Sequence, residues 1–281
     1  MMRDFQCFFP LQCSKIKTSP RLWIAIVLTF LIAGGMALDY NRVAEYMNEG
    51  IQICETAIMF FSYRVTFMFY IFGLCLILSD APFWDENTIY YISRMSGKRW
   101  MLCVFKYIFV VSLLYTVFIS SVGVLFTIGR VAFSTEWSAS AQAVAYDEVF
   151  IGQGQGVYFS DMVLKMYSPY GAFFRQMILI VLYGYFMGSI VTIYNITFRS
   201  NAGFVAAVSL HALMLVISLD NLPVFKHFSL YNYASITTQR DGMSFLLSVI
   251  ILIVIDIAIS FYGLRAIRKA DISTTTMEWI S

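Results

Sequence analysis

Charged residues are scarce in this chain of 281 residues: Asp, Glu, Lys and Arg together make up 13% of it, whereas 59% is hydrophobic. Soluble globular proteins are nearer ~45–50% apolar and about 25% charged. The composition therefore excludes an ordinary soluble domain, and the mean hydropathy of +0.73 indicates an integral membrane protein.

Residues suited to metal binding, disulfide formation or nucleotide hydrolysis are also few. The two histidines and five cysteines show no CxxC spacing, so nothing predicts a metal site. Cys7, Cys13 and Cys103 fall in or beside segments that the charge distribution below predicts to be cytoplasmic, Cys75 lies in an apolar run, and only Cys54 lies outside, so no pair is placed to oxidise. The chain has no GxxxxGK[ST] motif and no evident catalytic set. We therefore expect no enzyme active site, no directly bound cofactor and no nucleotide-hydrolysing module in it.

Six apolar runs have about the length of a membrane-spanning helix, which needs about 20 mostly apolar residues. They are 22–38, 57–79, 107–129, 176–198, 200–219 and 242–264. The first is short, but Pro20 and Arg21 before it and Asp39 after it give it clear ends, and Arg21 can snorkel to the headgroups. A removable signal peptide is the alternative for this run, although a long mixed segment precedes it. We predict an all-α polytopic fold with six spans and a single transmembrane domain over 1–281.

The basic residues are distributed unevenly between the two sides of this predicted topology. Twelve of the nineteen fall on one side: Arg3, Lys15, Lys17, Arg21, Arg94, Lys98, Arg99, Lys106, Arg199, Arg265, Arg268 and Lys269. By the positive-inside rule both termini are cytoplasmic, in a multi-pass protein of the cell membrane, which we expect to be bacterial. The segment 80–100 is then a cytoplasmic loop.

This loop has the pattern of an amphipathic helix. Between Pro82 and Trp100, apolar and aromatic residues recur at spacings near three and four. Pro82 suits a helix start, the acidic residues Asp85 and Glu86 complement the helix dipole in the first turn, and Gly97 suits an end. An interfacial helix that only rests in the headgroups is the alternative interpretation.

A family resemblance favours a more specific function. The basic start of the first span, KTSPRLWIAIVLTFL at Lys17 to Leu31, and the run ISRMSGKRWMLCVFKYI at Ile92 to Ile108 resemble the membrane subunits of type-2 ABC exporters. Six spans with both ends inside also resemble that family. The resemblance implies that 80–100 is a coupling helix that docks on a separate ATPase subunit. It also implies that 1–21 is an interfacial segment that touches the ATPase.

Further expectations follow from the resemblance. The residues implied to form the ATPase-coupling surface are Asp85, Glu86, Tyr90, Arg94, Lys98 and Arg99, with Gly97, Lys98 and Arg99 as the turn into the third span. The partners would be an ABC ATPase subunit, a second permease copy or a similar subunit, and membrane lipid, with ATP bound only by the ATPase and with no nucleic acid. The cargo would be a peptide, a lipid-like molecule or another amphipathic compound. The alternatives are a stand-alone secondary carrier and a membrane scaffold or immunity protein.

Three ionisable residues lie within the predicted spans: Arg64, His211 and Asp256. Such residues are costly in lipid and indicate an interior partner or a water-lined path. Arg64 can also snorkel outward. For Asp256 we expect pairing with a hydroxyl or backbone group, and the unequal depths of the two argue against an Arg64–Asp256 ion pair. His211 can serve in a proton relay or, more commonly, as an interhelical hydrogen-bond partner.

Two other features bear on packing and on the external side. Gly184 and Gly188 form a GxxxG pair that permits close helix contact, within one subunit or across a dimer. The external connection 130–175 is predicted to hold a short helix or hairpin rather than a domain. The segment 218–235 is either an ordinary external loop or a set of short helices that re-enter the outer leaflet.

Overall fold

The computed structural model describes residues 2–82, 96–146, 157–198, 202–218, 227–237 and 244–269, and this part of the chain is almost entirely helical. The helices are α1 (Met2–Thr18), α2 (Pro20–Met47), α3 (Glu55–Ser62), α4 (Arg64–Leu78), α6 (Gly97–Thr127), α7 (Ala139–Tyr146), α9 (Asp161–Met166), α10 (Pro169–Phe198), α11 (Ala202–Ile217), α12 (Leu230–Ala234) and α13 (Phe245–Lys269). The 3-10 turn η1 (Ile128–Arg130) follows α6, and the short strands β1 (Ile51–Gln52) and β2 (Val131–Ala132) pair in parallel.

Four of the described helices are long and apolar enough to cross a membrane: α2, α6 with η1, α10 and α13. The pair α3 and α4 passes the same test but is bent by 89°, so it forms a broken span or a re-entrant loop. Helix α11 is apolar but has 16 residues. At 1.5 Å per residue it is about 24 Å long, short of the ~30 Å hydrocarbon core. The described chain therefore has four or five candidate spans, and the sixth, at 200–219, stays a prediction.

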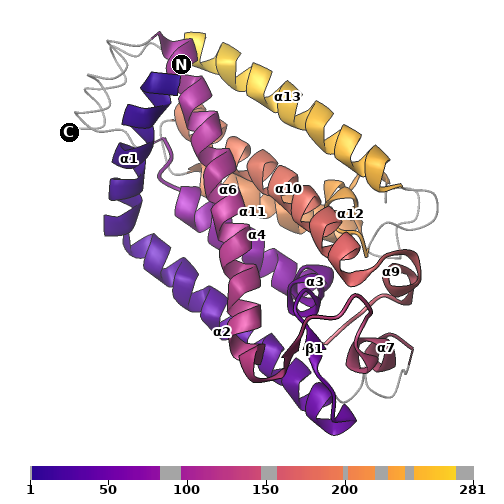
Figure 1. Cartoon of the computed structure of the whole chain (residues 1–281). Coiled ribbons are helices and arrows are strands. Elements are labelled where there is room, and N and C mark those ends of the chain that lie inside the picture. Colours follow the sequence, from indigo (N-terminus) through magenta and orange to yellow (C-terminus); the bar gives the residue numbers. More distant parts are fainter. Residues whose placement is uncertain are drawn as a thin grey trace.

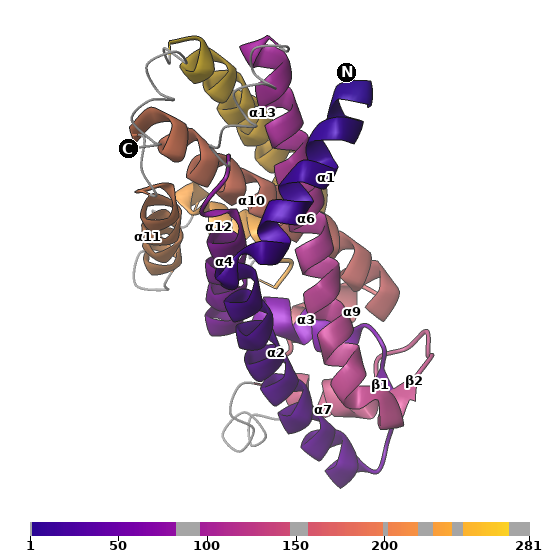
Figure 2. The same cartoon turned by 90° about the vertical axis from the view of Figure 1, so that its left-hand side faces the viewer.

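Helix α10 lies at the centre of the bundle and contacts α4, α6, α11 and α13. Its most apolar stretch is 72% buried, against 17% for α13, which lies on the outside against α10 and α6. Helix α2 packs against α4 and α6 on the other side, as Figure 1 shows. The start of α6 and the end of α13 lie at the same end of the bundle as α1, whereas β1, β2 and α7 lie at the opposite end (Figures 1 and 2).

The boundary between α1 and α2 follows from local capping. Ser19 has an extended backbone and its hydroxyl accepts a hydrogen bond from the Arg21 amide, while Pro20 occupies the first helical position. Helix α2 continues to Met47, nine residues beyond the predicted end at Leu38, and Asn48 ends it in the left-handed conformation with φ 53°. The predicted first span is therefore the first part of a longer helix.

The second predicted span, 57–79, was expected to be one helix, and this is wrong. Tyr63 has an extended backbone and separates α3 from α4. The Thr66 hydroxyl donates to the Phe60 carbonyl across the break and to the Tyr63 carbonyl, which also accepts from the Phe67 amide at 3.0 Å. A hydroxyl at this place makes the break tolerable in apolar surroundings, because each freed carbonyl that stayed unpaired would cost several kcal/mol.

The third predicted span also needs correction at its start. Helix α6 begins at Gly97 rather than at Tyr107, so Gly97, Lys98 and Arg99 form its first turn instead of a turn that precedes it. The physical reason is the packing of this extra length: Trp100, Met101, Cys103 and Val104 are buried, whereas Lys98 and Arg99 are exposed. The early part of α6 is thus an amphipathic extension of the span.

The two glycines of the GxxxG pair lie at contacts within the chain. A Cβ atom on Gly184 would lie 2.7 Å from the Tyr70 hydroxyl of α4, and one on Gly188 would lie 2.6 Å from both Ile108 of α6 and Leu78 of α4. Central helix α10 can therefore approach α4 and α6 this closely only because these positions lack side chains.

The connection that is predicted to be external folds around one buried carboxylate, Glu55, at the start of α3. Its oxygens accept hydrogen bonds from the Tyr40 hydroxyl at 2.8 Å, from the Ser138 amide at 2.7 Å and hydroxyl at 2.8 Å, and from the Gln52 amide at 3.1 Å. Four donors and the positive end of α3 together compensate the buried charge. The described part of 130–175 is thus a small cap of η1, β2, α7 and α9, held to α2 and α3.

A stability comparison of two glycine variants tests the packing of α10. We expect Gly188→Ala to destabilise the protein by about 1–3 kcal/mol, because its methyl group meets two side chains that are already packed. Gly35→Ala in α2 is the matched control, since a Cβ there has nothing within 4 Å, and it should stabilise the helix by up to about 1 kcal/mol. Thermal unfolding in detergent measures both, and equal effects of the two variants would contradict the close contact.

Candidate functional site

Four of the six residues implied in ATPase coupling lie outside the described residues: Asp85, Glu86, Tyr90 and Arg94. The other two, Lys98 and Arg99, are exposed in the first turn of α6. What the structure describes is how the chain is held on the two sides of 83–95, at the end of α4 and at the start of α6.

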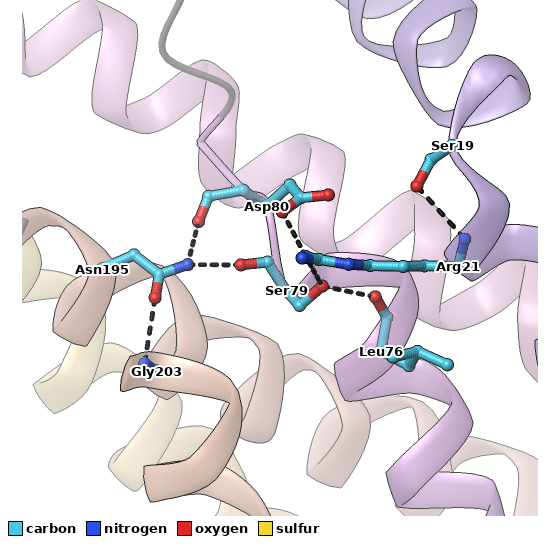
Figure 3. A network of polar contacts seen from close by, with 8 residues as sticks. Ser19, Arg21, Leu76, Ser79, Asp80, Asn195 and Gly203 are labelled. Atoms are coloured by element: carbon cyan, nitrogen blue, oxygen red, sulfur yellow. Dashed lines mark hydrogen bonds and ion pairs between the residues drawn. The ribbon is translucent and has the colours of Figure 1, made fainter. Parts of the chain in front are cut away.

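A polar network holds the end of α4 to three other helices (Figure 3). Arg21 of α2 forms an ion pair with Asp80 and donates to the Ser79 hydroxyl at 2.6 Å. The Asn195 amide of α10 donates to the Ser79 carbonyl at 2.7 Å and to the Ala81 carbonyl at 2.8 Å. Its oxygen accepts from the Gly203 amide of α11 at 3.0 Å. We call Arg21, Ser79, Asp80, Asn195 and Gly203 the α4-end network.

Two members of this network, Ser79 and Asn195, bind backbone groups at helix ends: the Ser79 hydroxyl donates to the Leu76 carbonyl at 2.7 Å, and Asn195 binds the groups given above. The last carbonyls of α4 and the first amides of α11 lack partners within their own helices, and the one amide side chain of Asn195 serves both ends. Gly203 is required because a Cβ there would lie 2.1 Å from the Val191 carbonyl oxygen. Helix α11 can therefore begin against α10 only at a glycine.

The sequence interpretation missed this network. For Arg21 the sequence indicated only that it can snorkel to the headgroups; the structure pairs it with Asp80, and both side chains keep about a third of their surface exposed. One sequence feature could have indicated the ion pair. Arg21 and Asp80 carry opposite charges and both fall on the predicted cytoplasmic side, Arg21 just before the first span and Asp80 just after the second. Asn195 carried no such signal, because a single amide inside an apolar run does not reveal its partners.

Arg64 and His211 lie at one aromatic cluster inside the bundle. His211 Nδ1 and the Tyr183 hydroxyl are 2.8 Å apart, and the imidazole stacks on Phe67 with ring centroids 5.7 Å apart. Arg64, at the bend between α3 and α4, interacts electrostatically with Tyr231 of α12, whose ring lies 6.2 Å from that of His211. This geometry matches an interhelical hydrogen-bond partner for His211. Buried α12 lies against α10, α11 and α13.

Asp256 does not join this cluster. It lies in α13 with 6% of its surface exposed, and neither carboxylate oxygen has a hydrogen-bond partner among the described residues. The expected pairing with a hydroxyl or backbone group is therefore wrong: the neighbouring Tyr185 and Ser260 hydroxyls bond to each other at 2.7 Å instead. Asp256 lines a cleft of about 400 Å³ between α6, α10 and α13. Of the three intramembrane ionisable residues, the structure brings together Arg64 and His211 and leaves Asp256 apart.

Comparison of the chain with known protein families, with curated proteins and with solved structures finds no match in any of the three. The functional argument therefore rests on the residues and on the geometry described above.

Replacement of Asn195 tests the importance of the α4-end network. We expect Asn195→Ala to lower the midpoint of thermal unfolding by about 4–10 °C, because it leaves buried carbonyls of Ser79 and Ala81 without donors, at ~1–3 kcal/mol. Gln142→Ala is the control, since it removes one exposed side-chain hydrogen bond, at 3.0 Å to the Trp137 carbonyl. An Asn195→Ala variant as stable as the control would show that the network contributes little.

Proposed function

We propose that this chain is the permease subunit of an ATP-driven exporter of the type-2 ABC class, which works as a dimer with separate ATPase subunits. The observation that carries the proposal is the α4-end network, which ties the chain just before 83–95 to α2, α10 and α11. A soluble partner that moves 83–95 would therefore move several helices together.

The N-terminal helix adds support. Helix α1 places Phe8, Gln12 and Ile16 on one buried stripe at a spacing of four residues, and its last turn carries the exposed Lys17. It contacts α6, where the Phe9 and Tyr107 rings lie 6.4 Å apart. An amphipathic helix that ends at the Ser19 cap suits a position along the membrane surface. This is the position that the resemblance implies for 1–21.

The proposed cycle needs no chemistry on the cargo. ATP binding closes the pair of ATPases and draws the two 80–100 segments together. The α4-end network transmits this movement to α2, α10 and α11, because its ion pair and hydrogen bonds fix the end of α4 to them. The ATP-bound ATPase makes different contacts in the two states, and this difference shifts the equilibrium toward release outside. The cargo is an amphipathic compound such as a peptide or lipid-like molecule.

Affinity purification tests the proposal most directly. The tagged full-length chain is isolated from its native membrane in mild detergent, its co-eluting proteins are identified, and the ATPase activity of the eluate is measured. A stoichiometric soluble subunit with nucleotide-binding motifs supports the proposal. A chain that elutes alone and without ATPase activity contradicts it and favours a secondary carrier or a scaffold.

Charge reversal in 83–95 tests where the ATPase docks. We expect Glu86→Lys or Arg94→Glu to abolish ATPase binding and transport while the protein remains folded in the membrane, because the docking surface would repel its partner. Lys165→Glu is the control, since Lys165 is an exposed charge of α9, which lies away from the α1 end of the bundle (Figure 1). Binding and transport at the level of the unchanged protein would refute the assignment of this surface.

A further inference from the structure

The carboxylate of Asp256 lies near the middle of the 25-residue helix α13. It falls on the inner stripe of that helix, at a spacing of four residues from the buried Ser248 and Leu252. The residue has 6% of its surface exposed, and in the part of the chain that the structure describes both oxygens lack hydrogen-bond partners. Burial of an ionised carboxylate without a partner is very costly, so this group is stable only if it is protonated or if a positive charge reaches it.

The described part of the chain supplies no such charge. Arg265 lies nine residues further along α13, about 13 Å along the helix axis, which is too far for an ion pair. Its guanidinium carbon lies over the Phe261 ring at 5.0 Å from the centroid. Arg64 interacts with Tyr231 in the separate aromatic cluster.

The cleft beside Asp256 has the size and the walls of a binding site. Its volume of about 400 Å³ falls within the ~300–1,000 Å³ of typical ligand pockets. Its aromatic walls are Phe109 of α6, Tyr185 of α10 and Phe261 of α13, and the remaining walls are mainly aliphatic. Aromatic faces attract organic cations, more strongly when water is excluded. One acidic group among aromatic rings therefore suits a cation with an apolar body.

We propose that this cleft binds a lipophilic organic cation, with the positive charge at Asp256 and the apolar body against Phe109, Tyr185 and Phe261. Both carboxylate oxygens are covered, so the bound cation compensates the negative charge across the wall of the cleft rather than by direct contact. The cleft lies between α13, which is mostly exposed, and the central helix α10, so a ligand dissolved in the membrane reaches it without crossing the bundle.

This site deepens the proposed function, because under that function the bound cation belongs to the cargo class. Binding itself rests on the cleft alone and requires no ATPase. A failure of binding therefore leaves the exporter proposal untouched, and an absent ATPase leaves the binding site untouched.

Two probes of the same shape and opposite charge test the site. The purified full-length chain in detergent is titrated with tritiated tetraphenylphosphonium, and displaceable binding is measured by scintillation proximity. Tetraphenylborate is tested as a competitor. We expect saturable binding of the phosphonium and at least tenfold weaker competition by the borate, because the carboxylate attracts one probe and repels the other.

Variants locate the binding to the cleft. Asp256→Asn keeps the shape of the side chain and should weaken phosphonium binding at least tenfold, whereas Asp256→Glu should keep affinity within about threefold, since it retains the charge. Phe109→Ala should weaken phosphonium binding severalfold, because it removes one aromatic wall of the cleft while the buried charge of Asp256 stays unchanged. Gel filtration verifies that each variant is folded. Equal affinity for the two probes, or an Asp256→Asn variant that binds the phosphonium as tightly as the unchanged protein, overturns the proposal.

Discussion

The side-chain amide of Asn195 is the contact on which the arrangement of the helices at the α1 end depends. It donates to the carbonyls of Ser79 and Ala81 and accepts from the amide of Gly203, so the end of α4, the end of α10 and the start of α11 meet at one residue. Helix ends inside an apolar bundle leave backbone groups that water does not reach. One amide that both donates and accepts satisfies them, and this places the segment after α4 beside Arg21.

The same constraint explains several other polar contacts of the bundle. The Thr29 and Tyr115 hydroxyls lie 2.9 Å apart and join α2 to α6, while those of Tyr70 and Thr116 lie 2.9 Å apart and join α4 to α6. The four donors around Glu55 do the same for the external cap. A membrane interior has no driving force that favours helix contact over lipid contact by hydrophobicity alone, so such pairs and small residues select the helix neighbours. Asp256 is the buried carboxylate that departs from this pattern among the described residues, and this is the basis of the ligand proposed for its cleft.

The bundle has three polar sites, and each lies among a different set of helices. The α4-end network ties four helices together and lies next to 83–95, where an external force can be applied. The cluster of Arg64, His211 and Tyr231 surrounds the 89° bend between α3 and α4, and the Asp256 cleft lies between the central helix and the most exposed one. Under the proposed function, the ATPase would act at the α4-end network and the cargo would bind at the cleft, and α10 contributes to both through Asn195 and Tyr185.

The sequence by itself determined the helical membrane character, the approximate places of the apolar helices and the close contact at Gly184 and Gly188, because hydrophobic length and small-residue spacing are local properties. It also set the expectations for Asp85, Glu86, Tyr90 and Arg94, which the described residues leave as predictions. Only the tertiary structure decided the break at Tyr63, the partners of Arg21 and Asn195, and the lack of a partner for Asp256. These features depend on which helices become neighbours. The local sequence around residues far apart in the chain, such as Ser79 and Asn195, does not indicate that they are in contact.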